Sequence, residues 1–256
     1  MTSWRDRLRS AGSRLSGIGS SGSSSASTDV EKIHQEARKF GEYVQSTLNS
    51  TICDHVKITA VVSPKRDIVI VAKGLSKTSM GSESFPLRSR THYDKGAKVT
   101  VQAWMDLSFR FCYDPEGEYL TVLSSFVAIF GDAEGNACLC HFDYERNKAD
   151  GYPEAHIQVY GDSPVLNAWG GTLLERGLHR LHFPAGHRRF RWCLEDVIEF
   201  VIAEKMVDAK PGWEKVIEPG RKRFHQMQLK AAMRRDMDTA IRYLEGEGYT
   251  VIPPAE

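Results

Sequence analysis

The feature that most constrains the fold is a long stretch of period-two alternation between residues 98 and 113. Every odd position from Val99 to Tyr113 is apolar, whereas most even positions, such as Asp106 and Ser108, are polar. Successive side chains of a β-strand point to opposite faces of its sheet. The stretch therefore predicts a long strand in a sheet with one buried face, and we expect the odd positions from 99 to 111 to be buried.

Other segments complete a fold around this strand. Residues 114–117 read Asp-Pro-Glu-Gly, which suits a type I turn leading back into a second long strand. The expected further strands are 54–62, 67–73, 118–130, 137–145, 155–161 and 178–183. Helical spacing of apolar residues predicts helices over 29–49, 193–206 and 221–245. Strands grouped between helices indicate an α+β fold. We expect an antiparallel sheet of about five to seven strands, with an N-terminal helix and C-terminal helices packed on one face.

The N-terminal segment differs in composition from the rest of the chain. Ten of the first 28 residues are Ser and four are Gly, so the segment has too little apolar surface to offset the entropy of ordering. We expect residues 1–28 to form a disordered tail and residues 29–256 to form a single α+β domain. Within that domain, residues 221–256 are expected to be a basic C-terminal helix and tail.

Charge and cysteine content bound the class of protein. Thirty-four Lys and Arg against 33 Asp and Glu give a net charge of +1, which by itself points to no polyanionic partner. The chain lacks a run of 18 apolar residues, so we expect no integral membrane association. The five cysteines are odd in number and form no CxxC pair, which favours buried thiols in a reducing, cytoplasmic compartment. No cofactor motif is present, and we expect neither a cofactor nor a bound metal.

The balanced net charge of the whole chain conceals a local block of basic residues. Residues 176–191 hold five arginines and no acidic residue. The planar guanidinium group makes paired hydrogen bonds to phosphate, so the block predicts an anionic ligand. The alternative is a solvated or internally paired basic surface. The candidate anion-binding residues are Arg180, Arg188, Arg189 and Arg191.

Candidate catalytic residues lie on two neighbouring predicted strands. Alternation places His141 and Asp143 on one face of the strand 137–145, and it groups His156 with Gln158 on the strand 155–161. If the two strands pair, His141, Asp143 and His156 share a polar face. Asp143 could then orient an imidazole that acts as a general base. The alternatives are a divalent ion held by these three ligands, or polar groups with a purely structural role.

The last predicted helix is also basic. Between residues 221 and 242 it carries seven Lys or Arg and two Asp, a local charge of +5. Such a helix can follow a phosphate backbone, dock an acidic partner, or simply face solvent.

Three short segments together resemble a known pattern. They are His141-Phe142-Asp143-Tyr144-Glu145-Arg146, Pro153–Gly161 around His156, and Leu181-His182-Phe183-Pro184 ahead of a helix. The order resembles small uncharacterised bacterial families with an Asp-Tyr strand, a Pro-x-x-His strand and a short x-Phe-Pro strand. Some of these resemble toxins of toxin–antitoxin pairs or phage-defence proteins. The resemblance implies a functional site that contains His156 and Asp143.

These observations favour a cytoplasmic bacterial protein of toxin or defence type that binds or acts on nucleic acid. If the protein is an enzyme, cleavage of RNA phosphodiester bonds fits best, with His156 or His141 as general acid or base and Asp143 orienting it. Arg188 or Arg189 would stabilise the charged transition state. The expected partners are RNA or another nucleic acid, and a cognate antitoxin or other protein.

Two other classes of function stay open on the sequence alone. The first is a non-catalytic adaptor that uses the basic helix and the sheet surface. The second is a binder of a small ligand on the antiparallel sheet.

Overall fold

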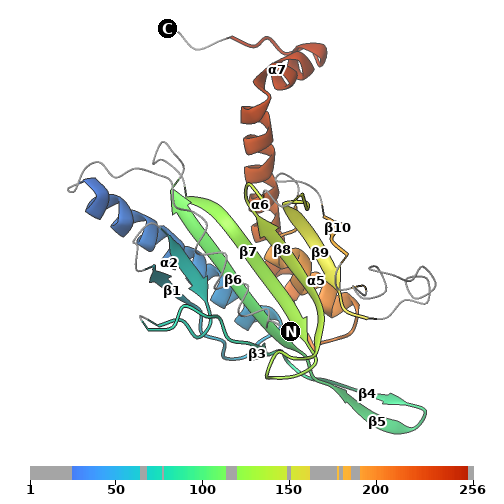
Figure 1. Ribbon diagram of the computed structural model, residues 1–256. Helices are drawn as coiled ribbons and strands as arrows, with labels where there is room; N and C mark the ends of the chain where they lie inside the picture. Colours follow the sequence, from blue (N-terminus) through green and yellow to red (C-terminus); the bar gives the residue numbers. More distant parts are fainter. Residues whose placement is uncertain are drawn as a thin grey trace.

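One large antiparallel sheet forms the centre of the molecule, and helices cover one of its faces (Figure 1). The covering helices are α2 (Ser25–Thr51), α5 (Leu194–Ala203) and the first part of α6 (Trp213–Arg235). This arrangement confirms the predicted α+β class, with an N-terminal helix and C-terminal helices. The structure is a computed structural model and, without the side chains of 25–30, it describes residues 25–63, 68–76, 78–113, 120–148, 151–161, 178, 181–185 and 191–252.

The sheet has eight strands, one more than the upper end of the expected range. Seven of them follow the order β1-β2-β6-β7-β8-β9-β10, and β3 also pairs with β6. The two strands β3 and β10 contain two residues each, which is too short to show a period in the sequence. The strands are β1 (Thr59–Val62), β2 (Val69–Ala72), β3 (Phe85–Pro86), β6 (Trp104–Tyr113), β7 (Leu120–Phe130), β8 (Cys138–Glu145), β9 (Ala155–Val159) and β10 (Phe183–Pro184).

The predicted helices are present with three differences in their bounds, one of which is that α6 begins at Trp213 rather than at residue 221. Helix α2 begins at Ser25 rather than at residue 29, and the rest of the predicted tail, residues 1–24, lies outside the described residues. The predicted helix 221–245 is two helices, α6 and α7 (Met237–Gly246). The break falls at Asp236, whose side chain accepts a hydrogen bond from the backbone N–H of Thr239, 3.1 Å away, and so caps α7.

The hydrophobic core lies between the helices and the odd positions of β6. Leu107 and Phe109 are buried there, and Phe40 of α2 packs edge-on against Phe109 with ring centroids 5.0 Å apart. The even positions of β6 were expected to face water. Instead, Asp106 is 0% exposed and Ser108 is 9% exposed. The middle of β6 is therefore buried on both faces, and the one-sided sheet predicted for it is wrong.

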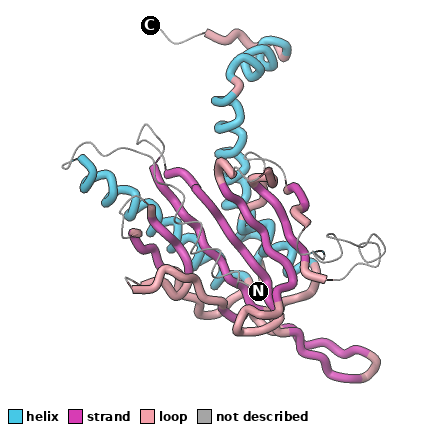
Figure 2. Tube along the Cα trace, viewed as in Figure 1, coloured by secondary structure: helices cyan, strands magenta, loops and turns pink. Residues whose placement is uncertain are grey.

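The predicted strand 98–113 is interrupted. Residues 97–101 form β5 (Ala97–Val101), which pairs with β4 (Arg90–Asp94) in a separate two-stranded sheet. This ribbon extends beyond the main sheet, so Val99 is 37% exposed rather than buried (Figure 2). The turn between its strands has positive φ angles at Lys95 (48°) and Gly96 (82°), as a two-residue type I′ hairpin turn requires.

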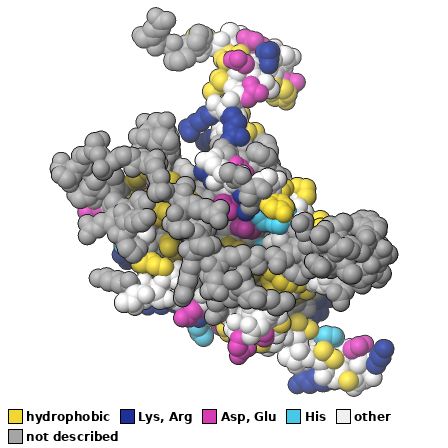
Figure 3. Space-filling view, in the orientation of Figure 1, with side chains coloured by type: hydrophobic (Ala, Val, Ile, Leu, Met, Phe, Trp, Pro, Cys, Tyr) yellow, Lys and Arg dark blue, Asp and Glu magenta, His cyan; other side chains and the backbone are white. Residues whose placement is uncertain are grey.

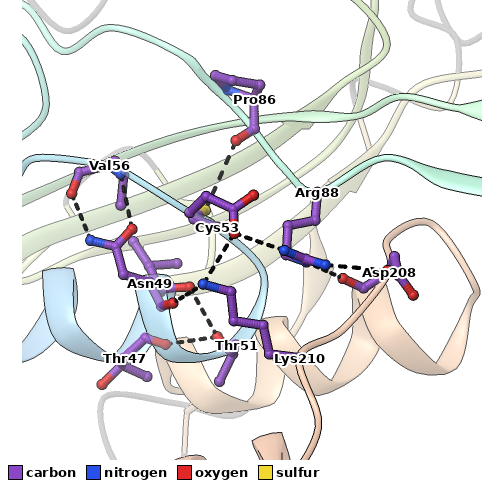
Figure 4. A network of polar contacts seen from close by, with 11 residues as sticks. Thr47, Asn49, Thr51, Cys53, Val56, Pro86, Arg88, Asp208 and Lys210 are labelled. Carbon is purple, nitrogen blue, oxygen red and sulfur yellow. Dashed lines mark hydrogen bonds and ion pairs between the residues drawn. The ribbon is translucent and has the colours of Figure 1, made fainter.

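A polar network ties the end of α2 to the segment after α5 (Figure 4). Arg88 donates to the Asp54 carboxylate at 2.7 Å and to the Asp208 backbone carbonyl at 2.9 Å. Lys210 donates to the Asn49 carbonyl at 2.7 Å and forms an ion pair with Asp54 at 3.1 Å. These contacts hold together chain segments that are more than 100 residues apart in the sequence. Within the described ranges, no helix combines the length and the apolar character needed to cross a membrane.

Candidate functional site

The face of the sheet opposite the helices carries the predicted histidines. Strands β8 and β9 pair antiparallel, with Asp143 opposite His156 and His141 opposite Gln158. Their side chains point away from Phe142 and Tyr144, which face the helices. The structure thus brings His141, Asp143 and His156 onto one polar face, which the sequence allowed only on condition that these strands pair.

His156 is the most enclosed member of this group. The residue is 1% exposed, and its Nδ1 lies 3.1 Å from the carbonyl oxygen of Pro153. A carbonyl oxygen only accepts hydrogen bonds, so Nδ1 carries a proton and Nε2 is the nitrogen that faces the site. Nε2 lies 3.7 Å from Oδ2 of Asp143. This distance is too long for a hydrogen bond, and the two side chains form an ion pair when His156 is protonated.

Further aromatic side chains surround the pair. The ring centroid of His156 lies 6.5 Å from that of His141 and 4.7 Å from that of His182. Tyr152 stacks on His182 with centroids 3.9 Å apart. The Gln158 amide donates to Nε2 of His182 at 3.3 Å. Three imidazoles and a carboxylate therefore lie together.

His182, Gln158 and Tyr152 were not among the predicted site residues. His182 was named from the sequence only as part of the segment Leu181–Pro184, with no role assigned to it. Its place in the cluster follows from β10, where Pro184 pairs with His156. A strand of two residues gives no periodic signal by which its partner could be found.

The polar face continues onto β6. The register connects Asp143 through Phe126 to Ser108, and His141 through Ala128 to Asp106. Arg110 lies on the same face one step further along β6. Burial lowers the pKa of Arg110, while the nearby Glu145 carboxylate acts in the opposite direction. An arginine titrates so far above neutral pH that Arg110 remains charged. The face thus also holds a positive charge near the Glu145 carboxylate.

Of the four predicted anion-binding arginines, the structure describes only Arg191, which does not lie at this cluster. Arg180, Arg188 and Arg189 lie outside the described residues. The guanidinium carbon of Arg191 lies 3.8 Å from the ring centroid of Tyr144, on the helix-covered side of the sheet. The Gln228 side chain accepts from the backbone N–H of Arg191 and donates to its carbonyl, at 3.2 and 2.9 Å. The structure therefore separates Arg191 from His156 by the thickness of the sheet.

The basic helix is partly neutralised by its own neighbours. Arg221 forms an ion pair with Asp196 at 2.9 Å and another with Glu199. The Arg223 guanidinium lies 4.6 Å above the ring of Tyr43. These two residues hold α6 against α2 and α5. The excess charge of +5 therefore overstates what α6 and α7 offer to a partner.

The arrangement is suited to moving protons. Imidazoles 6.5 Å apart with a carboxylate beside one of them can accept a proton at one point and deliver another nearby. In the part of the chain that the structure covers, no three His, Cys, Asp or Glu side chains are grouped so as to hold a metal ion.

Comparisons with known proteins do not add to this geometry. Profiles of known protein families, curated proteins and solved structures give no match to this chain.

Proposed function

We propose that this protein acts on RNA and cleaves its phosphodiester backbone by general acid–base chemistry. The observation that carries the proposal is the pair formed by Asp143 and His156, 3.7 Å apart, with the second imidazole of His141 beside it. Cleavage of RNA needs one group to remove a proton and another to supply one, a short distance apart. This pair and His141 offer both.

Exposure divides the roles between the residues. His141 is half-buried and is assigned as the general base. The side chain of Asp143 is 28% exposed, whereas that of His156 is only 2% exposed. Asp143 therefore presents the proton of the pair to the substrate, and His156 is a positioning residue that shares and holds this proton.

The proposed reaction transfers the phosphorus from the 5′-oxygen of the next nucleotide to the neighbouring ribose 2′-oxygen. His141 takes the proton of a ribose 2′-hydroxyl, and the resulting oxygen forms a bond to the adjacent phosphorus. The bond from phosphorus to the 5′-oxygen of the next nucleotide breaks, and that oxygen receives the proton held by the Asp143–His156 pair. The products are a 2′,3′-cyclic phosphate and a 5′-hydroxyl end. Arg188 or Arg189 is proposed to stabilise the negative charge on phosphorus.

The proposed biological setting is a bacterial toxin or defence system in the cytoplasm. Two observations support this setting: the resemblance of the segments around Asp143 and His156 to such families, and the five free cysteines. Burial raises the pKa of the Cys53 thiol to about 12, which keeps it protonated and inert. A toxic nuclease needs restraint, so an antitoxin or another protein partner is part of the proposal.

The first experiment is an end-group analysis. Purified protein is incubated with single-stranded RNA labelled at the 5′ end. The proposal expects fragments that end in 2′,3′-cyclic phosphate, and expects no cleavage of the same RNA with 2′-O-methyl groups. Expression should slow bacterial growth. Intact RNA together with normal growth would contradict the proposal.

A second candidate function, that of a non-catalytic interaction protein, is favoured by the far end of the chain. Helix α6 extends away from the sheet and carries α7 at its end (Figure 1). Large apolar side chains are exposed there: Met227, Leu229, Met233, Met237 and Tyr243. An exposed patch of this kind beside basic residues suits an acidic protein partner. Stable capture of one partner by a wild-type protein that leaves RNA intact would favour this candidate.

A further inference from the structure

The ribbon formed by β4 and β5 is the most exposed regular element of the described fold. It leaves the end of the main sheet and extends away from it (Figures 1 and 2). All ten residues from 91 to 100 are exposed. An isolated pair of strands is at best marginally stable in water, and its open edges invite aggregation. The ribbon is therefore a candidate surface for binding a partner.

The register gives the ribbon two different faces. Thr91 lies opposite Thr100, with hydroxyl oxygens 3.1 Å apart, and Tyr93 lies opposite Lys98. These four side chains share one face, and all of them bear hydrogen-bonding groups. Tyr93 is 76% exposed. The other face carries Val99 and Val101 with neighbouring polar residues. The face of Thr91 and Tyr93 is thus a hydroxyl-rich surface.

The ribbon is also basic. Residues 90–101 include three cationic side chains, Arg90, Lys95 and Lys98, and one acidic side chain, Asp94, so their net charge is +2. Lys95 stands at the tip, in the turn. Figure 3 shows Lys and Arg side chains spread along the projecting ribbon rather than gathered at its base. A projecting cationic element is electrostatically complementary to the phosphates of a nucleic acid.

We propose that the β4–β5 ribbon binds the minor groove of paired RNA. That groove is wide and shallow and displays 2′-hydroxyls, which both donate and accept hydrogen bonds. Thr91, Tyr93 and Thr100 contact these hydroxyls, and Lys95 and Lys98 contact the phosphates on either side. This inference rests on the proposed function for its choice of RNA. The ribbon would hold a stem while an adjoining single-stranded segment reaches the polar face of the sheet.

The test uses the full chain, a labelled RNA hairpin and the DNA hairpin of the same sequence. The wild-type protein should bind the RNA hairpin more tightly than the DNA hairpin. The double variant Lys95→Gln/Lys98→Gln should bind the RNA hairpin about tenfold more weakly. Its log–log salt dependence should be flatter by about two units, one for each lost phosphate contact. The control Lys57→Gln/Lys215→Gln removes the same charge from exposed lysines elsewhere and should bind as the wild type does.

The hydroxyl face is tested separately. The double variant Thr91→Val/Thr100→Val should lose most of the preference for RNA over DNA, because it keeps the strands and removes only the hydroxyls. Equal binding of the two hairpins by the wild type would overturn the inference. Unchanged RNA binding by the Lys95→Gln/Lys98→Gln variant would also overturn it. If that variant binds RNA normally but has a different oligomeric state, the ribbon joins two copies of the chain and the inference fails.

The experiments distinguish a failure of the ribbon inference from a failure of the proposed RNA cleavage. Cleavage of single-stranded RNA is measured on the same proteins. If His141→Ala still cleaves while the lysine variant loses hairpin binding, the proposed chemistry fails and the ribbon inference stands. If His141→Ala is inactive and the lysine variant binds the hairpin normally, only the ribbon inference fails.

Discussion

Oδ2 of Asp143 and Nε2 of His156 face each other across neighbouring strands at 3.7 Å. Both strands are paired on each side, β8 with β7 and β9 with β10, so the backbone under the pair is fixed. The Pro153 carbonyl fixes the other nitrogen of the imidazole. A pair held by the sheet in this way needs little reorganisation during a reaction, which is the condition under which acid–base groups act efficiently.

The burial of His156 changes what its replacement should do. If His156 lay on an open polar face of the sheet, His156→Ala would leave folding nearly intact. With 1% exposure and a hydrogen bond to Pro153, the variant instead leaves a cavity and an unsatisfied carbonyl. We expect a loss of about 1–3 kcal/mol in the free energy of unfolding. Urea unfolding measures this loss. The variant His55→Ala, at an exposed position, serves as the control and should unfold as the wild type does.

The two parts of the alternating stretch should respond differently to truncation. Leu107 is fully buried beneath the helices, so Leu107→Ala should cost about 2–5 kcal/mol. Val99 is exposed on the ribbon, so Val99→Ala should change stability by about 0.5 kcal/mol or less. The midpoints of denaturant unfolding compare the two variants. Equal losses would mean that Val99 is packed in the core and that the β4–β5 ribbon does not project from the main sheet.

Helix α6 approaches α2 and α5 closely at Gly220. A Cβ atom there would overlap the Tyr43 hydroxyl and the Glu195 carboxylate, which are hydrogen-bonded to each other. Burial, together with that hydrogen bond, raises the pKa of Tyr43 to about 12. We expect Gly220→Ala to lower the free energy of unfolding by about 1–3 kcal/mol.

The matched control for this substitution is Gly246→Ala. Gly246 belongs to α7 and has open space around its Cα, so an added methyl group meets nothing. This variant should be neutral or slightly stabilising. Thermal unfolding of the two variants side by side checks both expectations. A Gly220→Ala variant as stable as Gly246→Ala would show that α6 does not pack as described.

The network in Figure 4 predicts an acid-dependent loss of stability. Hydrogen bonds from Lys210 and Arg88 lower the pKa of Asp54 below its ordinary value of 3.8. A carboxyl whose pKa is lower in the folded state stabilises the fold above its ordinary pKa. It loses that contribution as the pH falls through the folded value. Because the side chain is half exposed, the contribution is about 1 kcal/mol or less.

Asp54→Asn should therefore lower stability at neutral pH and remove part of the decline below about pH 4. Asp94→Asn, at an exposed position on the ribbon, is the control and should retain the full decline. Urea midpoints measured between neutral and acidic pH give the comparison. An Asp54→Asn variant whose midpoints match those of the wild type throughout would contradict the role of the network.

Much of the fold could be predicted because its signals are local. The alternation around Leu107 and the helical spacing in α5 each depend on a few adjacent residues. The end of the long strand near Val101 could not be predicted, since the apolar alternation continues unbroken from the ribbon into the sheet. The turn between β4 and β5 also has a lysine, Lys95, at a position where Asn or Asp is usual.

The site could be predicted only in part. Asp143 and His156 were identified because alternation assigns each to a face, but their pairing depends on the register between β8 and β9, which no local pattern fixes. His182 joins them through a strand too short to detect. Arg191 was grouped with the basic block by sequence, yet α5 begins three residues later and Arg191 lies on the helix side of the sheet.

The most direct test of the central claim is the rate of RNA cleavage by Asp143→Asn. The substitution keeps the shape and hydrogen-bonding capacity of the side chain but removes the carboxylate that forms an ion pair with protonated His156. The proposed mechanism predicts a rate about 10²- to 10⁴-fold below that of the wild type, with folding confirmed by circular dichroism and His55→Ala as the active control. Cleavage by Asp143→Asn at the wild-type rate would contradict that mechanism.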